Sequence, residues 1–340
     1  MVREACYKIT EDCPCRCTFC DSYIKYNEVL KKQVISYEEW KSISDKLIGQ
    51  GLQSVVISGG EPLLRPDVTL KLIKYLKANN VYVVLNTSAV LFRKGNYVLL
   101  EEVIKAAPNL IVFSVDSSEA EKHDENRNRH GLYEQVIESI KYLKSNSDVS
   151  VGIRTVITRN NYKELPEIIE IFGNLNVDCI KLTHIENDVE DEYVLHEKDL
   201  VYFNECTKKD MIQKIRYLNT SQQLQLENEK SINSILADMN LFASISKGMF
   251  SPTYIGNTQC CLQGRFFSIQ SNGDVLPCCE AEHHYYPVLG NLLRDSVNDI
   301  IDSDDFNRFL NHRLDYCSRC TQMQNFQLSF KKSTKIVERR

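Results

Sequence analysis

The chain has 340 residues, which exceeds the usual size of one domain and fits a large domain with a smaller one. Its 43% hydrophobic and 26% charged residues are ordinary for a globular protein, and its net charge of −5 gives no electrostatic reason to expect nucleic acid binding. No apolar stretch is long enough to cross a bilayer, and no charged-then-apolar signal precedes the first predicted strand. We therefore expect a cytoplasmic protein that binds neither nucleic acid nor membrane.

The first predicted element is a strand at 5–10, and a cysteine-rich loop follows it directly. Cys13, Cys17 and Cys20 have the spacing Cys-x3-Cys-x2-Cys. Three thiolates in one turn suit an iron–sulfur cluster with an incomplete protein shell, because a cubane has four irons and one iron stays open to a small molecule. The alternative is a zinc site completed by Cys15, although zinc motifs usually pair two close cysteines with a distant second pair.

A glycine-rich turn follows the second predicted strand. The apolar run Val55–Ile57 reads as a buried strand, and the next residues are Gly59-Gly60-Glu61-Pro62. Because glycine has no Cβ, backbone at these two positions can approach a ligand closely.

Together the two motifs resemble the radical SAM superfamily. In that family Cys-x3-Cys-x2-Cys, with an aromatic residue before the last cysteine, holds a [4Fe–4S] cluster whose open iron binds S-adenosylmethionine (SAM). The Gly-Gly-Glu-Pro motif there meets the SAM ammonium group. The resemblance implies cluster ligands at Cys13, Cys17 and Cys20, and SAM-site residues at Phe19, Gly59, Gly60 and Glu61.

Strand-like and helix-like segments alternate from residue 1 to about 187. The predicted strands lie at 5–10, 54–58, 81–86, 110–115, 149–157 and 177–183. A capping box at Ser36–Glu39 begins one predicted helix, and others begin after Pro66, before Val136 and near Tyr162. Alternation implies parallel strands with right-handed crossovers, and six units are too few for an eight-fold barrel. The α/β pattern matches the partial (β/α)6 barrel of the radical SAM family.

Polar residues follow or end later strands, where sites in parallel barrels lie. Ser114 and Asp116 end the fourth strand, and Arg154 lies on the fifth. In similar enzymes these positions contact the methionine carboxylate or ribose of SAM, so the resemblance assigns Ser114 and Arg154 to the cofactor. The alternatives are a helix cap and a solvent-facing arginine. His123-Asp124 and Arg127 resemble an HD..R stretch of the family, which we expect to serve loop structure.

The thirteen cysteines are grouped, with four near the start and six between Cys260 and Cys320. In a large chain without a secretion signal, such clusters favour metal over disulfides. Phe266–Ile269 and Val275–Leu276 form a predicted hairpin around Asn272-Gly273. A final Cys-x2-Cys pair lies at 317–320.

This region resembles the SPASM/twitch extension of radical SAM proteins, which binds an auxiliary [4Fe–4S] cluster. Because no cysteine follows Cys320, we expect the single-cluster twitch form. The competing assignment is a zinc ribbon, whose hairpin geometry is alike. The implied ligands are Cys261, Cys278, Cys317 and Cys320, with Cys260 or Cys279 as alternatives within the doubled pairs. The predicted units are a barrel core at 1–187, a helical connector at 188–250, the auxiliary domain at 251–325 and a tail at 326–340.

The resemblance implies reductive cleavage of SAM to a 5′-deoxyadenosyl radical that removes a substrate hydrogen. We expect modification of a ribosomally made peptide by crosslinking or epimerisation. The alternative is a dehydrogenase or epimerase of a sugar, aminocyclitol or nucleoside. A molybdopterin-precursor cyclase is disfavoured because those enzymes end in Gly-Gly, and a redox-sensing module is the non-enzyme alternative.

Further participants follow from the same resemblance. An electron donor such as flavodoxin or ferredoxin is needed, and a peptide substrate calls for a separate leader-peptide-binding protein. Hydrogen donors for an epimerase would be Cys179, Cys206 or Cys279, although buried apolar cysteines are the commoner interpretation.

Overall fold

The structure is a computed structural model that describes residues 2–20, 34–185, 191–218, 222–234, 265–278, 288–311 and 326–330. Its centre is a sheet with the strand order β10-β6-β5-β4-β3-β2-β1-β7-β8-β9. The six predicted strands run parallel to one another in this sheet. They are β1 (Glu4–Lys8), β2 (Ser54–Ser58), β3 (Tyr82–Thr87), β4 (Leu110–Ser114), β5 (Ser150–Ile157) and β6 (Cys179–His184).

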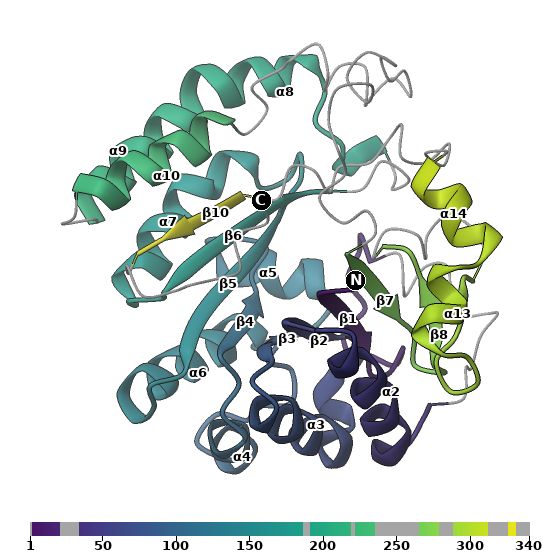
Figure 1. Ribbon diagram of the computed structural model, residues 1–340. Helices are drawn as coiled ribbons and strands as arrows, with labels where there is room; N and C mark the ends of the chain where they lie inside the picture. The colour runs from purple at the N-terminus through teal and green to yellow at the C-terminus, as the bar shows by residue number, and fades with distance from the viewer. Residues whose placement is uncertain are drawn as a thin grey trace.

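Helices join these strands, and most of them lie along the outer side of the curved sheet (Figure 1). They are α2 (Tyr37–Gly49), α3 (Pro66–Ala78), α4 (Val98–Ala106), α5 (Ala120–Arg127), α6 (Leu132–Asn146) and α7 (Leu165–Asn174). The unclosed sheet with outer helices confirms the predicted partial α/β barrel. Helices α4 and α5 were not anticipated from the sequence, since neither shows a strong start signal.

Local chemistry explains where α2 begins and what it covers. The Ser36 hydroxyl accepts a hydrogen bond from the Glu39 N–H, and the Glu39 carboxylate accepts one from the Ser36 N–H, which is the predicted capping box. Trp40 on the inward face is fully buried and stacks on Tyr7 of β1 with ring centroids 4.9 Å apart. The helix is thereby held against the strand that leads into the cysteine loop.

Strand residues alternate between two environments. The outward-facing residues, such as Leu85 and Ile153, are fully buried beneath the helices. The inward-facing residues form a separate apolar cluster at the amino ends of the strands, made of Val84, Leu110, Val112 and Cys179. Further along the same inner face the residues are polar and only half-buried: Lys8, Ser58, Asn86, Ser114, Arg154 and Lys181. The inner mouth at the carboxyl ends is therefore polar and accessible.

Segments from the C-terminal part extend both edges of the sheet (Figure 1). β7 (Phe266–Ile269) pairs in parallel with β1, and its hairpin with β8 (Asp274–Leu276) turns at Asn272-Gly273 as predicted. β9 (Gly290–Asn291), α13 (Val297–Ile301) and α14 (Asp304–Asn311) follow. β10 (Phe326–Ser329) pairs antiparallel with β6 at the other edge, a strand not anticipated from the sequence.

Helices also occupy the described part of the predicted connector. These are α8 (Glu197–Tyr202), a π-helical turn at Phe203–Thr207, α9 (Lys208–Leu218) and α10 (Gln222–Ser234). On α10, the Asn228 side chain donates to the Ser329 carbonyl of β10 and accepts from the Ser329 N–H, both at 2.9 Å. Across the described ranges, no helix has the length and apolar character needed to span a membrane.

Candidate cofactor site

The loop of Cys13, Cys17 and Cys20 follows β1 at the carboxyl end of the sheet. Two backbone hydrogen bonds attach it to the end of α5: Thr18 N–H donates to the Asn126 carbonyl at 2.9 Å, and Arg16 N–H donates to the Arg127 carbonyl at 3.2 Å. The last carbonyls of a helix lack partners within the helix, so they are available to hold a neighbouring loop. The end of α5 therefore anchors the cysteine loop from one side.

The two predicted glycines hold the same loop from the other side. Gly60 N–H donates to the Thr10 carbonyl at 2.7 Å, and Glu61 N–H donates to the Asp12 carbonyl at 2.9 Å. A Cβ on Gly60 would lie 2.2 Å from the Asp12 oxygen, and one on Gly59 would lie 2.3 Å from the Thr10 oxygen. Here the glycines allow close approach to the backbone that leads into Cys13. Their contact with SAM stays a prediction.

Glu61 is fully buried and its carboxylate is saturated with hydrogen bonds. It accepts bonds from the Thr87 hydroxyl, from both the N–H and the hydroxyl of Ser88, and from the Leu63 N–H, at 2.6–3.2 Å. Burial raises the pKa of Glu61, and the Ser88, Thr87 and Leu63 bonds oppose that rise. The side chain thus ties the β2 turn to the end of β3. A direct contact with the SAM ammonium group stays a prediction.

Ser114 and Arg154 lie next to each other on the inner mouth. They are register partners across β4 and β5, and Arg154 is in turn the register partner of Lys181 on β6. Two cationic side chains on adjacent strands favour binding of an anionic group between or above them. The structure brings the two predicted residues together, and their role in binding the SAM carboxylate stays a prediction.

The thiols of the loop fit an iron–sulfur cluster by their chemistry. With Cys15, the loop holds four cysteines, and none of the four is in a disulfide. Cys15 and Cys17 are buried, and Cys13 and Cys20 pack beside them against Val90 and Leu132. Burial raises the pKa of Cys17 to about 12, and because a cysteine ligates metal as a thiolate, metal binding there would release its proton. Within the described ranges no three His, Cys, Asp or Glu side chains already converge as a metal site.

One buried ion pair beside the loop was not recognised from the sequence. Arg127 donates from Nε and Nη2 to the two oxygens of Asp116, at 2.5 and 2.8 Å. The sequence shows Arg127 within the HD..R stretch, but nothing in the sequence shows that Asp116 is the partner of Arg127. As expected from the sequence, His123 and Asp124 serve loop structure: His123 Nδ1 accepts from the Asp116 N–H, and Asp124 accepts from backbone N–H groups at the start of α6.

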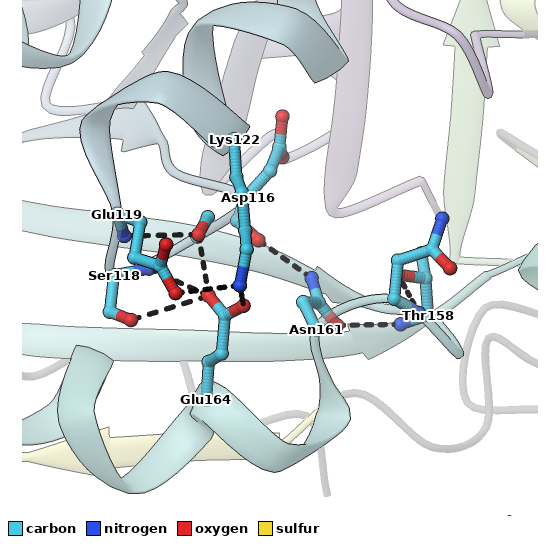
Figure 2. Close-up of polar contacts among 9 residues, drawn as sticks. Asp116, Ser118, Glu119, Lys122, Thr158, Asn161 and Glu164 are labelled. Carbon is cyan, nitrogen blue, oxygen red and sulfur yellow. Dashed lines mark hydrogen bonds and ion pairs between the residues drawn. The ribbon is translucent and has the colours of Figure 1, made fainter.

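The loop after β4 is fastened to the loop after β5 (Figure 2). Asn161 donates to the backbone carbonyl of Asp116 at 2.8 Å and accepts from the Thr158 N–H. Glu164 accepts bonds from the Ser118 N–H and from Lys122, at 3.1 and 2.8 Å. These contacts make the two loops one rigid edge of the inner mouth.

The auxiliary ligands are only partly within the described residues. Cys278 is half-buried and packs with Phe266 against Cys6 of β1, at the amino end of the barrel strands. Cys261, Cys317 and Cys320, with the alternatives Cys260 and Cys279, lie outside the described ranges. The auxiliary ligand set stays a prediction.

Comparisons with known proteins place the chain in a family. Residues 7–172 match the radical SAM superfamily, and residues 260–321 match SPASM, an iron–sulfur cluster-binding domain. PqqA peptide cyclase of Bradyrhizobium diazoefficiens is 25% identical over 281 residues, covering 81% of this chain and 66% of that protein. AdoMet-dependent heme synthase of Methanosarcina barkeri is 25% identical over 300 residues, covering 86% and 80%. Streptococcus suis SuiB bound to precursor peptide SuiA gives a TM-score of 0.67 at 16% identity, covering 95% of this chain and 70% of SuiB.

An unclosed parallel barrel with a cysteine loop on a Gly-Gly turn defines a radical SAM fold. Residues 7–172 belong to the radical SAM superfamily, and residues 260–321 are a SPASM domain. The predicted family is confirmed, and with it the cofactors that the family implies, a [4Fe–4S] cluster with SAM and an iron–sulfur cluster in the SPASM domain. The chain spans just under two thirds of the length of the peptide cyclase that it matches, 66%.

Gly60→Ala tests the close approach at the cysteine loop. Its Cβ would lie 2.2 Å from a backbone oxygen, so residues 10–12 have to move and Cys13 moves with them. We expect about 10–100-fold weaker cluster retention, the range for groups that position metal ligands. Iron content after anaerobic reconstitution and a chelator challenge measures it. Gly49→Ala is the control, because a Cβ there meets nothing within 4 Å. Equal iron retention by the two variants would contradict the role of Gly60.

Titration of His123 predicts a pH dependence of stability. Burial lowers the pKa of His123 to about 4, with Asp116 and Asp124 opposing and Arg127 adding to the shift. The unfolded chain therefore binds the proton first, and stability is lost as pH falls from the unfolded value of about 6.5 toward 4. Between pH 7.5 and 5.5 we expect wild type to lose roughly 1 kcal/mol more stability than His123→Asn. Urea unfolding at both pH values measures this.

The control for the pH experiment is His130→Asn, which changes an exposed histidine just before α6. This variant should keep the pH dependence of wild type. If His123→Asn also keeps the wild-type pH dependence of stability, the burial of a neutral His123 does not cause that dependence.

Proposed function

We propose that this chain holds a [4Fe–4S] cluster on Cys13, Cys17 and Cys20 and cleaves SAM reductively. The observation that carries the proposal is the cysteine loop seated on Gly60 at the carboxyl ends of parallel strands. Bound together, cluster and SAM supply the chemistry of the family, in which a 5′-deoxyadenosyl radical removes a hydrogen atom from the substrate. The chain itself positions the cofactor, and we expect the substrate at the half-buried polar inner mouth.

Gly59, Gly60, Glu61 and Phe19 complete the proposed cofactor site with Ser114 and Arg154. Backbone at the β2 turn approaches the loop closely, and Arg154 beside Ser114 provides a cation and a hydroxyl for the carboxylate of SAM. The neighbouring Lys181 adds a second cation on the same face. An arginine on an inner strand, held by register, positions an anion better than a surface loop does.

The substrate that we propose is a ribosomally made peptide, modified by crosslinking or epimerisation. Support comes from the similarity to a peptide cyclase and from the fold shared with a protein bound to its precursor peptide. A small molecule is the second candidate, because the heme synthase matches over 86% of this chain. An electron donor such as flavodoxin or ferredoxin and a separate leader-peptide-binding protein complete the proposed system, in a reducing cytoplasm suited to thirteen cysteines.

Replacing Cys13, Cys17 and Cys20 together by Ala tests the proposed chemistry. Without the three thiolates the cluster has no ligands, so 5′-deoxyadenosine formation should fall to background under dithionite. Chromatography of the anaerobic reaction measures the product. The control is Cys206→Ala, which removes a half-buried thiol from the π-helical turn. It should retain SAM cleavage, because a hydrogen donor acts only after SAM has been cleaved. SAM cleavage by the triple variant would contradict the proposal.

Replacing Cys317 and Cys320 by Ala tests the auxiliary cluster. If these two residues ligate a cubane, iron should fall by about four per chain while the SAM-responsive cluster remains. Iron, sulfide and zinc are measured on the same reconstituted sample. A loss of zinc in place of iron would show a zinc ribbon.

A further inference from the structure

A buried ion pair lies directly behind the cysteine loop. Arg127 ends α5 with its side chain 11% exposed, and Asp116 follows β4 with its side chain 1% exposed. The two bonds between them, of 2.5 and 2.8 Å, join both carboxylate oxygens to one guanidinium group. A bidentate pair of this kind fixes orientation as well as distance.

Arg127 is attached to the cysteine loop through its backbone. Its carbonyl accepts from the Arg16 N–H, and the carbonyl of the preceding Asn126 accepts from the Thr18 N–H. Both donors lie between proposed ligands of the cluster, on either side of Cys17. One residue therefore joins the loop to the ion pair.

Arg127 is the member of the pair that is hydrogen-bonded to the cysteine loop, through its own carbonyl and the Arg16 N–H. Asp116 is in turn bound to the guanidinium of Arg127. The loop therefore has a buried cation beside it and a carboxylate bound to that cation.

Three contacts keep Asp116 from moving. Its side chain binds Arg127, its N–H donates to His123 Nδ1 at 3.2 Å, and its carbonyl accepts from Asn161 Nδ2 at 2.8 Å. Figure 2 shows Asn161 reaching Asp116 from the loop after β5. Asn161 also donates to the Val156 carbonyl, which fixes it to β5. The orientation of the charges is thus set by the sheet.

Stability alone does not account for this arrangement. Two charges removed from water lose hydration, and a buried pair is often no better for stability than apolar residues of the same volume. Specificity for the neighbouring group is the remaining reason to keep the pair. The neighbouring group is the proposed cluster loop.

We propose that Arg127 is a positioning residue that seats the cysteine loop and raises the reduction potential of its cluster, while Asp116 limits the rise. Reduction adds one negative charge to the cluster. A nearby cation stabilises that charge and a nearby carboxylate opposes it, strongly so where water is excluded. The inference rests on the proposed function, namely that Cys13, Cys17 and Cys20 hold the cluster.

The test is a potentiometric titration of the full-length reconstituted protein, followed by electron paramagnetic resonance. The signal that changes when SAM is added belongs to the site cluster, which separates it from the SPASM cluster. Arg127→Gln should shift the midpoint potential to more negative values and lower site iron. Asp116→Asn should shift it to more positive values. If the two substitutions only loosened the structure, they would not be expected to shift the midpoint potential in opposite directions.

Two further variants complete the design. Arg127→Lys keeps the positive charge but lacks the guanidinium group that makes the bidentate contact. The midpoint potential of the site cluster in this variant should therefore stay nearer to the wild-type value than in Arg127→Gln. Arg216→Gln is the matched control, because Arg216 makes the same bidentate contact with Glu229 on the exposed face of α9 and α10. Its potential should equal that of wild type.

Each outcome decides the matter. Unchanged potentials in both pair variants, or shifts in the same direction, would overturn the inference. If Arg127→Gln retains no cluster, Asp116→Asn decides alone: a positive shift supports the inference and an unchanged potential overturns it. A wild-type protein without a SAM-responsive signal would overturn the proposed function and this inference with it.

Discussion

The candidate site depends on one backbone contact, the approach of the Gly-Gly turn to the strand end that precedes Cys13. At Gly60 there is no space for even one extra carbon, since the Asp12 oxygen would be 2.2 Å from a Cβ. The contact places the loop after β1 on the turn after β2. All other features of the site are arranged around this junction, including the Glu61 carboxylate that ties the turn to β3.

Two buried carboxylates lie at the same end of the sheet. Glu61 is satisfied by four donor groups, and Asp116 by Arg127. Burying charge costs free energy unless every charged atom has a partner, and here the partners come from neighbouring strand ends. The result is a rigid polar rim around a half-buried inner mouth. Rigidity of this kind suits a site that has to hold a reactive cofactor in one orientation.

The sequence by itself determined the family, the fold class and most strand positions. β2 spans the predicted residues, and the other five barrel strands differ from prediction by one or two residues at their ends. These features were predictable because strand alternation, the capping box at Ser36 and the Asn272-Gly273 turn are local. The cysteine spacing is local too, so it identified the proposed ligands without any knowledge of their surroundings.

Only the tertiary structure decided which distant groups meet. Arg127 ends α5, eleven residues after Asp116, and their pairing depends on how that helix packs back toward the end of β4. The same holds for Glu61 with Ser88, for Ser114 beside Arg154 in the register, and for β10, a short strand defined by the open edge of β6. Such contacts arise from register and packing across strands, and no short sequence window contains them.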